Sequence, residues 1–230
     1  TAPRIFSTGT IVYGATTPYM VEIDTLDDAR SHLRRLKASG AWSIKSYNQP
    51  GRQQRQKLVK AGRETGIMVD VEGEGHFHNS ISMVLDGHGN IEHNLPVAHY
   101  YDDVIQLMSH ATSSNTPTLV VSFGELFGEN FLYQQERAWE DPKIKAFAQE
   151  ATSSYSALEV QGGAPVHSRN MTSIRVADEL WDIGFRSVSR SIKKLDDAGV
   201  RINVGSHGEI AGLALHCEMQ LLAQGGMSKH

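Results

Sequence analysis

The sequence contains a single cysteine, Cys217, which excludes an internal disulfide and a zinc site built from paired cysteines. Because this cysteine lies in the apolar stretch LALHCEMQLL, we interpret it as a core residue and not as a nucleophile. Long apolar runs are also missing, which excludes a segment that crosses a bilayer. Long runs of one charge are missing too, and the net charge is −4. This charge argues against nucleic acid or an anionic membrane as a partner.

What the sequence does contain is a repeated unit of a glycine, a short apolar strand, a polar loop and an amphipathic helix. The chain of 230 residues, with 40% hydrophobic composition, is long enough for one domain with its own core. Thr25 and Asp24 are candidate N-caps for the first helix, and Gly66 ends the second. The pattern predicts strands at residues 4–7, 41–47, 67–73, 90–94, 118–124 and 201–208. It predicts helices at 26–38, 52–65, 80–85, 100–109, 142–150, 174–198 and 212–224, and a loop at 153–168.

The alternation of strands with helices predicts parallel βαβ units, which occur in open doubly wound sheets and in closed barrels. No glycine-rich dinucleotide or phosphate-binding fingerprint follows any predicted strand, and this favours the barrel. A complete barrel of this kind has eight strands, and the sequence predicts six. We therefore expect an α/β fold, a TIM-type (β/α)8 barrel that is truncated, as a single partial domain over residues 1–230.

Ionisable side chains occur at or near the carboxyl ends of four predicted strands. Lys45, Glu72, His93 and His207 all have the parity of the polar face, whereas the alternate positions are mostly apolar. Parallel barrels keep their active sites at this end of the strands. Because uncompensated buried charges are costly, these side chains should pair with one another or bind a metal such as zinc. A purely structural ion pair between Lys45 and Glu72 is the alternative.

Most of the eleven histidines are explained more simply as surface or loop residues than as metal ligands. We expect His32, His110 and His230 at the surface and His167 in a loop. His76 and His78 have the spacing of a metal-binding pair, but they follow two glycines and fit a loop better. Together with His88 they are interpreted as surface or supporting residues. Asn90 and Glu92 are interpreted as packing or loop residues.

Five stretches give the chain a resemblance to a known family: APRIFSTGTIVYGAT, IKSYNQPGRQQRQKLVKAGRETG, VEGEG, GNIEHNLP and GVRINVGSHGEIAGLALHCEMQLLAQGGMS. They extend from end to end, and IKSYNQP and the last two are the most specific. The chain resembles the amidohydrolase superfamily, in particular the amidohydrolases that follow a TolB-like propeller. Prolidase-like and imidazolonepropionase-like enzymes are more distant relatives.

The resemblance implies roles for the four residues at the strand ends. Lys45 matches a lysine that many members carboxylate and use to bridge two metals, and His93 matches a histidine ligand. Glu72 stands where a histidine is common, and His207 stands where an aspartate usually binds metal and acts as general base. The resemblance also implies that the first strands are missing, with their His-x-His ligands, so that strands three to eight are present and the chain is an incomplete portion.

The predicted function is hydrolysis of an amide or other C–N bond in a small substrate. Lys45, Glu72 and His93 would hold one or two divalent ions, most simply zinc, which this chain can also lack. His207 would bind metal or accept a proton, since its unperturbed pKa is about 6.5. Tyr47 and Asn48 are candidate substrate-binding residues. The alternative is a non-catalytic binding or structural module with a degenerate site, and exposed sheet edges predict a homo-oligomer.

Overall fold

The structure is a computed structural model, and it describes part of the chain. The described residues are 3–15, 18, 20–73, 75–121, 142, 159–161, 164–166, 185–207 and 213–228. Within them no helix is long and apolar enough to cross a membrane. The predictions for residues 142–150 and 174–184, and those for His167 and His230, fall wholly or mostly outside the described residues.

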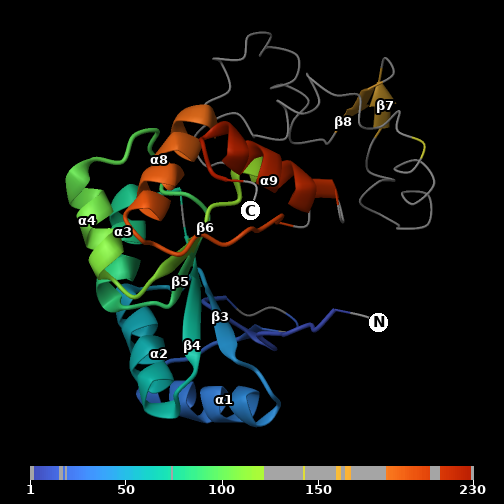
Figure 1. The fold of residues 1–230 in the computed structure, drawn as a ribbon. Helices are drawn as coiled ribbons and strands as arrows, with labels where there is room; N and C mark the ends of the chain where they lie inside the picture. Colours follow the sequence, from blue (N-terminus) through green and yellow to red (C-terminus); the bar gives the residue numbers. More distant parts are fainter. Residues whose placement is uncertain are drawn as a thin grey trace.

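The centre of the fold is a six-stranded sheet in which every neighbouring pair of strands is parallel. The strands lie in the order β2-β1-β3-β4-β5-β6 (Figure 1). A single parallel bridge between Asn115 and Ile202 sets a further segment of chain beside β6. The strands are β1 (Ile11–Tyr13), β2 (Met20–Val21), β3 (Ser43–Tyr47), β4 (Met68–Glu72), β5 (Asn90–Glu92) and β6 (Ser114–Thr116).

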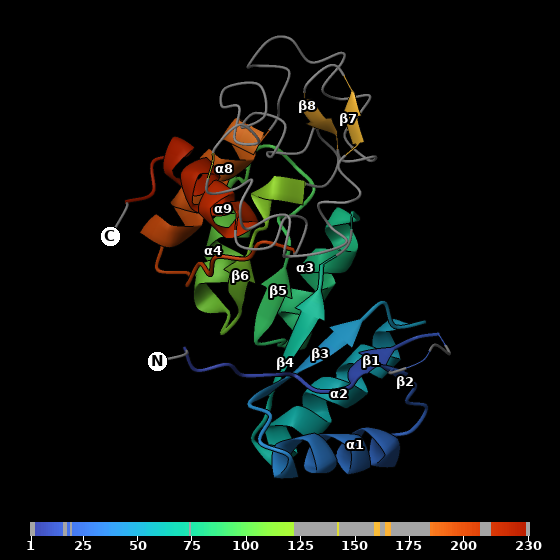
Figure 2. The same cartoon turned by 90° about the vertical axis from the view of Figure 1, so that its right-hand side faces the viewer.

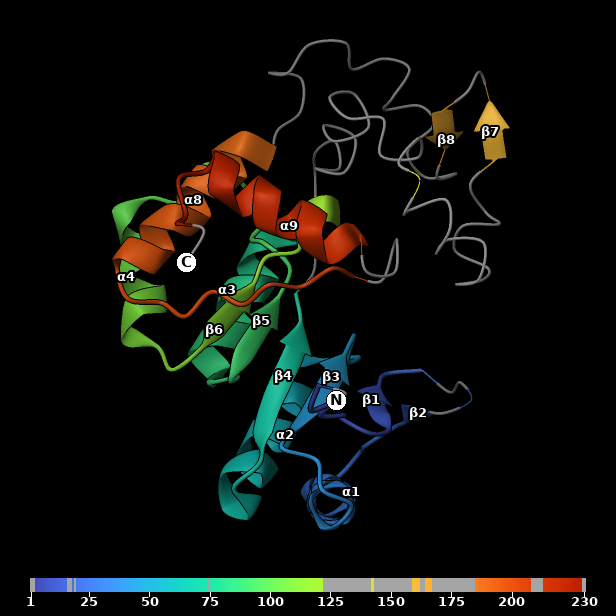
Figure 3. The same ribbon diagram turned by 45° about the vertical axis from the view of Figure 1, so that its right-hand side comes forward.

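Helices α2, α3 and α4 cover one face of this sheet (Figures 1 and 3). The alternate strand residues Ile44, Val69, Val71 and Ile91 are buried, as the helix-facing positions should be. The helices are α1 (Leu26–Ala38), α2 (Arg52–Thr65), α3 (Phe77–Asp86), α4 (Asp102–His110), α8 (Phe185–Asp197) and α9 (Leu213–Gln224), with the 3-10 helix η1 at Leu119–Val121.

Local sequence signals explain where the first two helices begin and end. Thr25 caps α1 in a capping box, in which its hydroxyl accepts from the Asp28 amide and the Asp28 carboxylate accepts from the Thr25 amide. Gly66 ends α2 in the left-handed conformation, with φ of 65°, which a glycine adopts without strain. The sequence predicted both helices with the observed bounds.

The apolar residues form two buried clusters. One cluster joins α1 and α2 to β1, β3 and β4, around Leu33, Ile44 and Leu58. The other joins α3, α4, α8 and α9 to β4, β5 and η1, around Met108, Leu119 and Ile192. Cys217 packs at the edge of the second cluster and is partly buried. The two clusters meet at β4, which contributes Val69 to one and Val71 to the other.

Three strand predictions were wrong. Residues 201–208 were predicted as a strand, but within the described residues 201–207 only Ile202 pairs with the sheet, through a single bridge to Asn115. Residues 4–7 are not a strand; the first strand is β1, which starts at Ile11. Residues 118–124 were predicted as a strand because they are apolar, but Leu119–Val121 form η1, and the polar segment Ser114–Thr116 is the strand instead. A short hairpin of β7 (Glu159–Gln161) and β8 (Ala164–Val166) lies where only a loop was predicted (Figure 2).

The α/β class is confirmed, whereas closure into a barrel stays a prediction. In the described residues the main sheet has β2 at one end and β6 at the other, so it is open. The strands point the same way, so the carboxyl ends of β3, β4 and β5 lie along one edge of the sheet (Figures 1 and 2). This edge carries the candidate site.

Candidate metal centre

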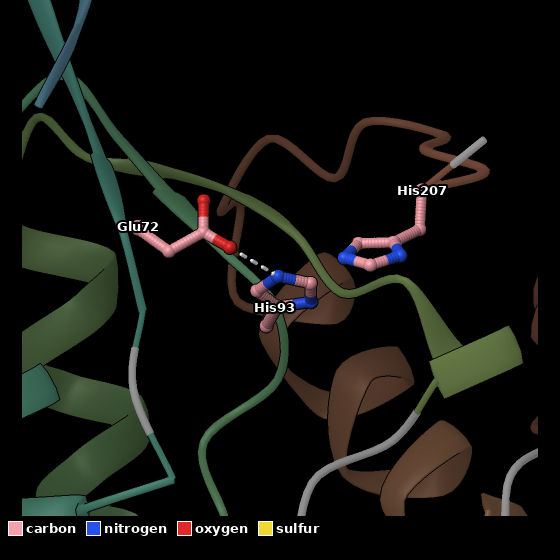
Figure 4. A group of neighbouring side chains, drawn as sticks. All are labelled: Glu72, His93 and His207. Atoms are coloured by element: carbon pink, nitrogen blue, oxygen red, sulfur yellow. Dashed lines mark hydrogen bonds and ion pairs between the residues drawn. The ribbon is translucent and has the colours of Figure 1, made fainter. Parts of the chain in front are cut away.

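Glu72, His93 and His207 meet at the carboxyl ends of the strands (Figure 4). Glu72 is the last residue of β4, His93 directly follows β5, and His207 lies in the segment that runs on from the bridge beside β6. One donor atom from each residue lies within 4.8 Å of the donor atoms of the other two. Glu72 and His93 are buried, whereas His207 is exposed. Among the described residues, this is the one group of three or more histidine, cysteine or carboxylate side chains with such spacing.

Both oxygens of Glu72 are engaged. Nε2 of His93 donates to Oε1 of Glu72 at 2.6 Å, and the Lys45 ammonium donates to Oε2. The ring of His207 lies beside the ring of His93, with 5.2 Å between their centroids. The structure therefore brings together all four residues that were predicted from the strand ends. The ion pair between Lys45 and Glu72, weighed above as an alternative, is present.

The backbone around this site is unusual. The non-glycine residues with positive φ are Asn48, His93, Thr118 and His207, at 24°, 69°, 48° and 55° within the described part of the chain. A positive φ is unfavourable for most residues, and especially for a β-branched residue such as Thr118. All four lie just beyond the strand ends or in the segments that line the site. This clustering of strained residues is typical of functional sites.

Thr118 supports His93 from the side opposite Glu72, a role that was not predicted from the sequence. Its Oγ1 is hydrogen-bonded to Nδ1 of His93, and Thr118 is 3% exposed. A hydroxyl can serve both tautomers of the ring, because it donates to a bare Nδ1 and accepts from Nδ1–H. When Nε2 binds a metal the proton must sit on Nδ1, and Thr118 can then accept it in a hydrogen bond. Because residues 118–124 were predicted as an apolar strand, Thr118 was not considered as a residue of the site.

The pKa values of the two glutamates at the site are shifted in opposite directions. Burial raises the pKa of Glu72, but hydrogen bonds from His93 and Lys45 outweigh burial, so that the pKa is lowered overall. Burial raises the pKa of Glu92, with Lys45 opposing it and the charges of Glu72 and Asp70 adding to it. Burial, followed by the charge of Glu72, raises the pKa of the Tyr47 hydroxyl. Of the two glutamates at the site, Glu72 is therefore the one whose surroundings favour the ionised form that a metal ligand needs.

A cavity of about 360 Å³ opens onto these residues. Tyr47, one of the two predicted substrate-binding residues, lines it, and the Lys45 ammonium lies 5.8 Å from the centre of the Tyr47 ring. Asn48 is exposed and is not among the lining residues, so the geometry does not bring it to the cavity. Glu92, interpreted above as a packing or loop residue, does line it. The lining residues are Ile11, Met20, Lys45, Tyr47, Glu72, Glu92, His93, Thr118, Gly205 and His207.

The remaining described histidines lie away from this centre. His76 and His78 are exposed at the start of α3, with 6.0 Å between their ring centroids, and His110 is exposed as predicted. His32 was expected at the surface but is buried, because it faces the sheet from α1 and contacts the Thr10 carbonyl. His88 is fully buried and donates from Nδ1 to the Met83 carbonyl.

The fold is shared with two solved hydrolases. One is a Xaa-Pro dipeptidase with methionine bound in its active site, with a TM-score of 0.56, 16% identity, and coverage of 99% of this chain and 53% of that one. The other is bottromycin amidohydrolase, with a TM-score of 0.55, 17% identity, and coverage of 92% of this chain and 48% of that one. The chain thus spans about half the length of each of these structures. No family model and no curated protein sequence matches the chain.

Proposed function

We propose that this chain is the metal-binding part of a hydrolase that cleaves an amide or other C–N bond in a small substrate. The observation that carries the proposal is the convergence of Glu72, His93 and His207 from three separate segments onto one point beside a cavity. The shared fold with a dipeptidase and an amidohydrolase supports it. Because those structures are about twice as long, we also propose that the open sheet is part of a β/α barrel.

The donor set fits a zinc-like ion. Two imidazoles and one carboxylate are a usual set of protein ligands for catalytic zinc, which keeps a further position open. His93 and Glu72 offer buried donors whose surroundings fix their orientation, and His207 offers an exposed one. When bound, a divalent ion would polarise a substrate carbonyl and lower the pKa of a coordinated water to about 7.

The residues around the donors have separate proposed roles. His207, as the exposed member, is proposed as a ligand or as the group that accepts the proton of the attacking water. Lys45 neutralises Glu72 as an ammonium, and after carboxylation it would instead offer an anionic oxygen at the same cavity. Tyr47 is proposed to contact the substrate from the cavity wall, whereas Asn48 lies outside the lining and its contact with a substrate stays a prediction.

Hydrolysis of a panel of dipeptides, N-acyl amino acids and cyclic amides tests the proposal. The assay uses the full-length protein, with zinc and after treatment with a chelator. We expect turnover that the chelator abolishes, that zinc restores, and that falls by about 100-fold or more in His93→Ala. Stoichiometric zinc binding without turnover of any panel member would favour the alternative of a binding module. Turnover that survives the chelator and Lys45→Ala would contradict the metal-dependent mechanism.

A further inference from the structure

Glu218 is a buried carboxylate that the proposed chemistry does not use. It lies in the middle of α9, is 0% exposed, and burial raises its pKa to about 7. A carboxylate in such a place is costly unless its oxygens are satisfied. Both are satisfied by the same short segment: Oε1 accepts from the Leu119 amide at 2.8 Å, and Oε2 accepts from the Val120 amide at 3.0 Å.

This contact fixes the backbone directly after Thr118. The two amides belong to η1, which packs against α9 and follows β6 (Figure 1). Thr118 itself has a φ of 48°, and its carbonyl accepts from the Val121 amide at 3.0 Å to close the turn. A β-branched residue keeps this conformation only when its surroundings hold it there. The Glu218 side chain accepts hydrogen bonds from the backbone amides of the next two residues of the chain.

Thr118, held in this backbone conformation, in turn contacts His93. Thr118 Oγ1 is hydrogen-bonded to Nδ1 of His93, on the side of the ring away from Glu72. We propose that Glu218 is a positioning residue, which acts through η1 and Thr118 to fix the orientation of the His93 ring. The predicted effect on metal affinity rests on the proposed metal centre. The predicted effect on the orientation of His93 does not require a metal.

A carboxylate is needed at this position because it accepts from two amides at once. In Glu218→Gln the shape is kept, but the amide nitrogen of the new side chain would face one of the backbone N–H groups. One buried donor would then lose its partner, and η1 would shift. An apolar side chain would leave both donors without a partner. Glu218 should therefore influence His93 through its two hydrogen bonds to η1, and not only through its packing in the core.

The test compares Glu218→Gln, Thr118→Val and the double variant in the full chain. The first readout is the pair of ¹⁵N chemical shifts of the His93 ring in metal-free protein, which report the hydrogen bonding at each ring nitrogen. The second is zinc affinity, measured by competition with a chromophoric chelator. We expect both single variants to change the His93 shifts and to weaken zinc binding by about 10- to 100-fold. We expect the double variant to be no weaker than Thr118→Val, because the two residues act in series.

Leu222→Ala is the control for loss of α9 packing, since Leu222 is buried on the same helix and its apolar side chain cannot hydrogen-bond to η1. It should destabilise the chain without changing the His93 shifts. If Glu218→Gln does not fold, Glu218→Asp keeps both oxygens on a shorter side chain and is measured instead. Unchanged His93 shifts in the folded Glu218 variant, the same change in Leu222→Ala, or additive effects in the double variant would each overturn the inference.

The two readouts separate this inference from the proposed function. If the wild-type chain binds no zinc but Glu218→Gln changes the His93 shifts, the positioning role stands and the metal centre fails. If the wild-type chain binds zinc and Glu218→Gln leaves both the shifts and the affinity unchanged, the metal centre stands and the positioning role fails.

Discussion

One carboxylate oxygen of Glu72 lies 2.6 Å from Nε2 of His93, and the other pairs with the Lys45 ammonium. In this arrangement the proton of His93 occupies the nitrogen that faces the proposed metal position. Binding of a divalent ion at Nε2 must therefore release that proton or move it to Nδ1, from which Thr118 can accept a hydrogen bond. Metal binding should accordingly replace the hydrogen bond between His93 and Glu72, and Glu72 should be the residue on which the site depends most.

Glu72→Gln is expected to weaken zinc binding by about 10-fold or more. The substitution keeps the shape but removes the charge and leaves the Lys45 ammonium without its partner. Competition with a chromophoric chelator at fixed pH measures the change. Glu64→Gln is the matched control, because it removes the same charge from an exposed pair with Arg30. Equal losses in both variants would show that overall charge, and not ligation, determines the affinity.

Lys45 is expected to take up carbon dioxide when zinc is present. The resemblance to amidohydrolases implies a carboxylated lysine here, and the half-buried amine at the cavity is placed for it. Chain loaded with zinc in ¹³C-bicarbonate should show a carbamate carbon signal by NMR that is missing in Lys45→Gln. A zinc-loaded chain with no such signal would leave Lys45 as the counter-ion of Glu72 and remove it from the ligand set.

Gly73→Ala is expected to destabilise the fold and disturb the site. A Cβ at Gly73 would lie 2.1 Å from the Glu92 carbonyl oxygen, which accepts from the Gly73 amide at 2.9 Å. Because both groups are backbone, the ends of β4 and β5 must move apart, at a cost of about 1–3 kcal/mol in the free energy of unfolding. Urea denaturation measures this cost. In the control Gly89→Ala the nearest atoms belong to the Met68 side chain, which can move, and the loss should be smaller.

His88 is expected to make the chain less stable in mild acid. Burial lowers its pKa from 6.5 to about 4, opposed by the Met83 carbonyl and by the charge of Asp86. The folded state then binds fewer protons than the unfolded state between these values. The stabilising contribution of neutral His88 is thus complete above pH 6.5 and is lost as the pH falls toward 4. The total loss in the free energy of unfolding is about 3 kcal/mol.

His88→Asn tests this dependence, because an asparagine amide can still donate to the Met83 carbonyl. The free energy of unfolding of this variant should fall less steeply between pH 6.5 and 4 than that of the wild-type chain. His110→Asn removes a histidine from the surface and is the control. A variant that loses stability in parallel with the wild-type chain would show that His88 is not the group responsible.

Much of the fold could be predicted because its signals are local. The capping box of Thr25 and Asp28 and the left-handed Gly66 define helix ends within a few residues of sequence. The strand at Ser114–Thr116 could not be predicted in this way. Its side chains are polar because they bond to Asn90 and Asn203 across neighbouring segments, and only the tertiary fold supplies those partners.

The candidate site was predicted for a related reason. Lys45, Glu72 and His93 are charged or titratable residues on strands whose other face is apolar, and alternation alone gives them a common direction. Thr118 and Glu218 escaped this reasoning, because threonine next to an apolar run and glutamate in a helix are ordinary in sequence. Their roles depend on contacts over 25 and 99 residues of chain separation.

Crystals of the full chain grown with zinc, measured on both sides of the zinc absorption edge, test the central claim most directly. The account predicts an anomalous difference peak at about 2.0–2.2 Å from a Glu72 oxygen and from a nitrogen of both His93 and His207. A chain that contains stoichiometric zinc but shows its peak elsewhere, or that shows no peak between these three residues at saturating zinc, would contradict it.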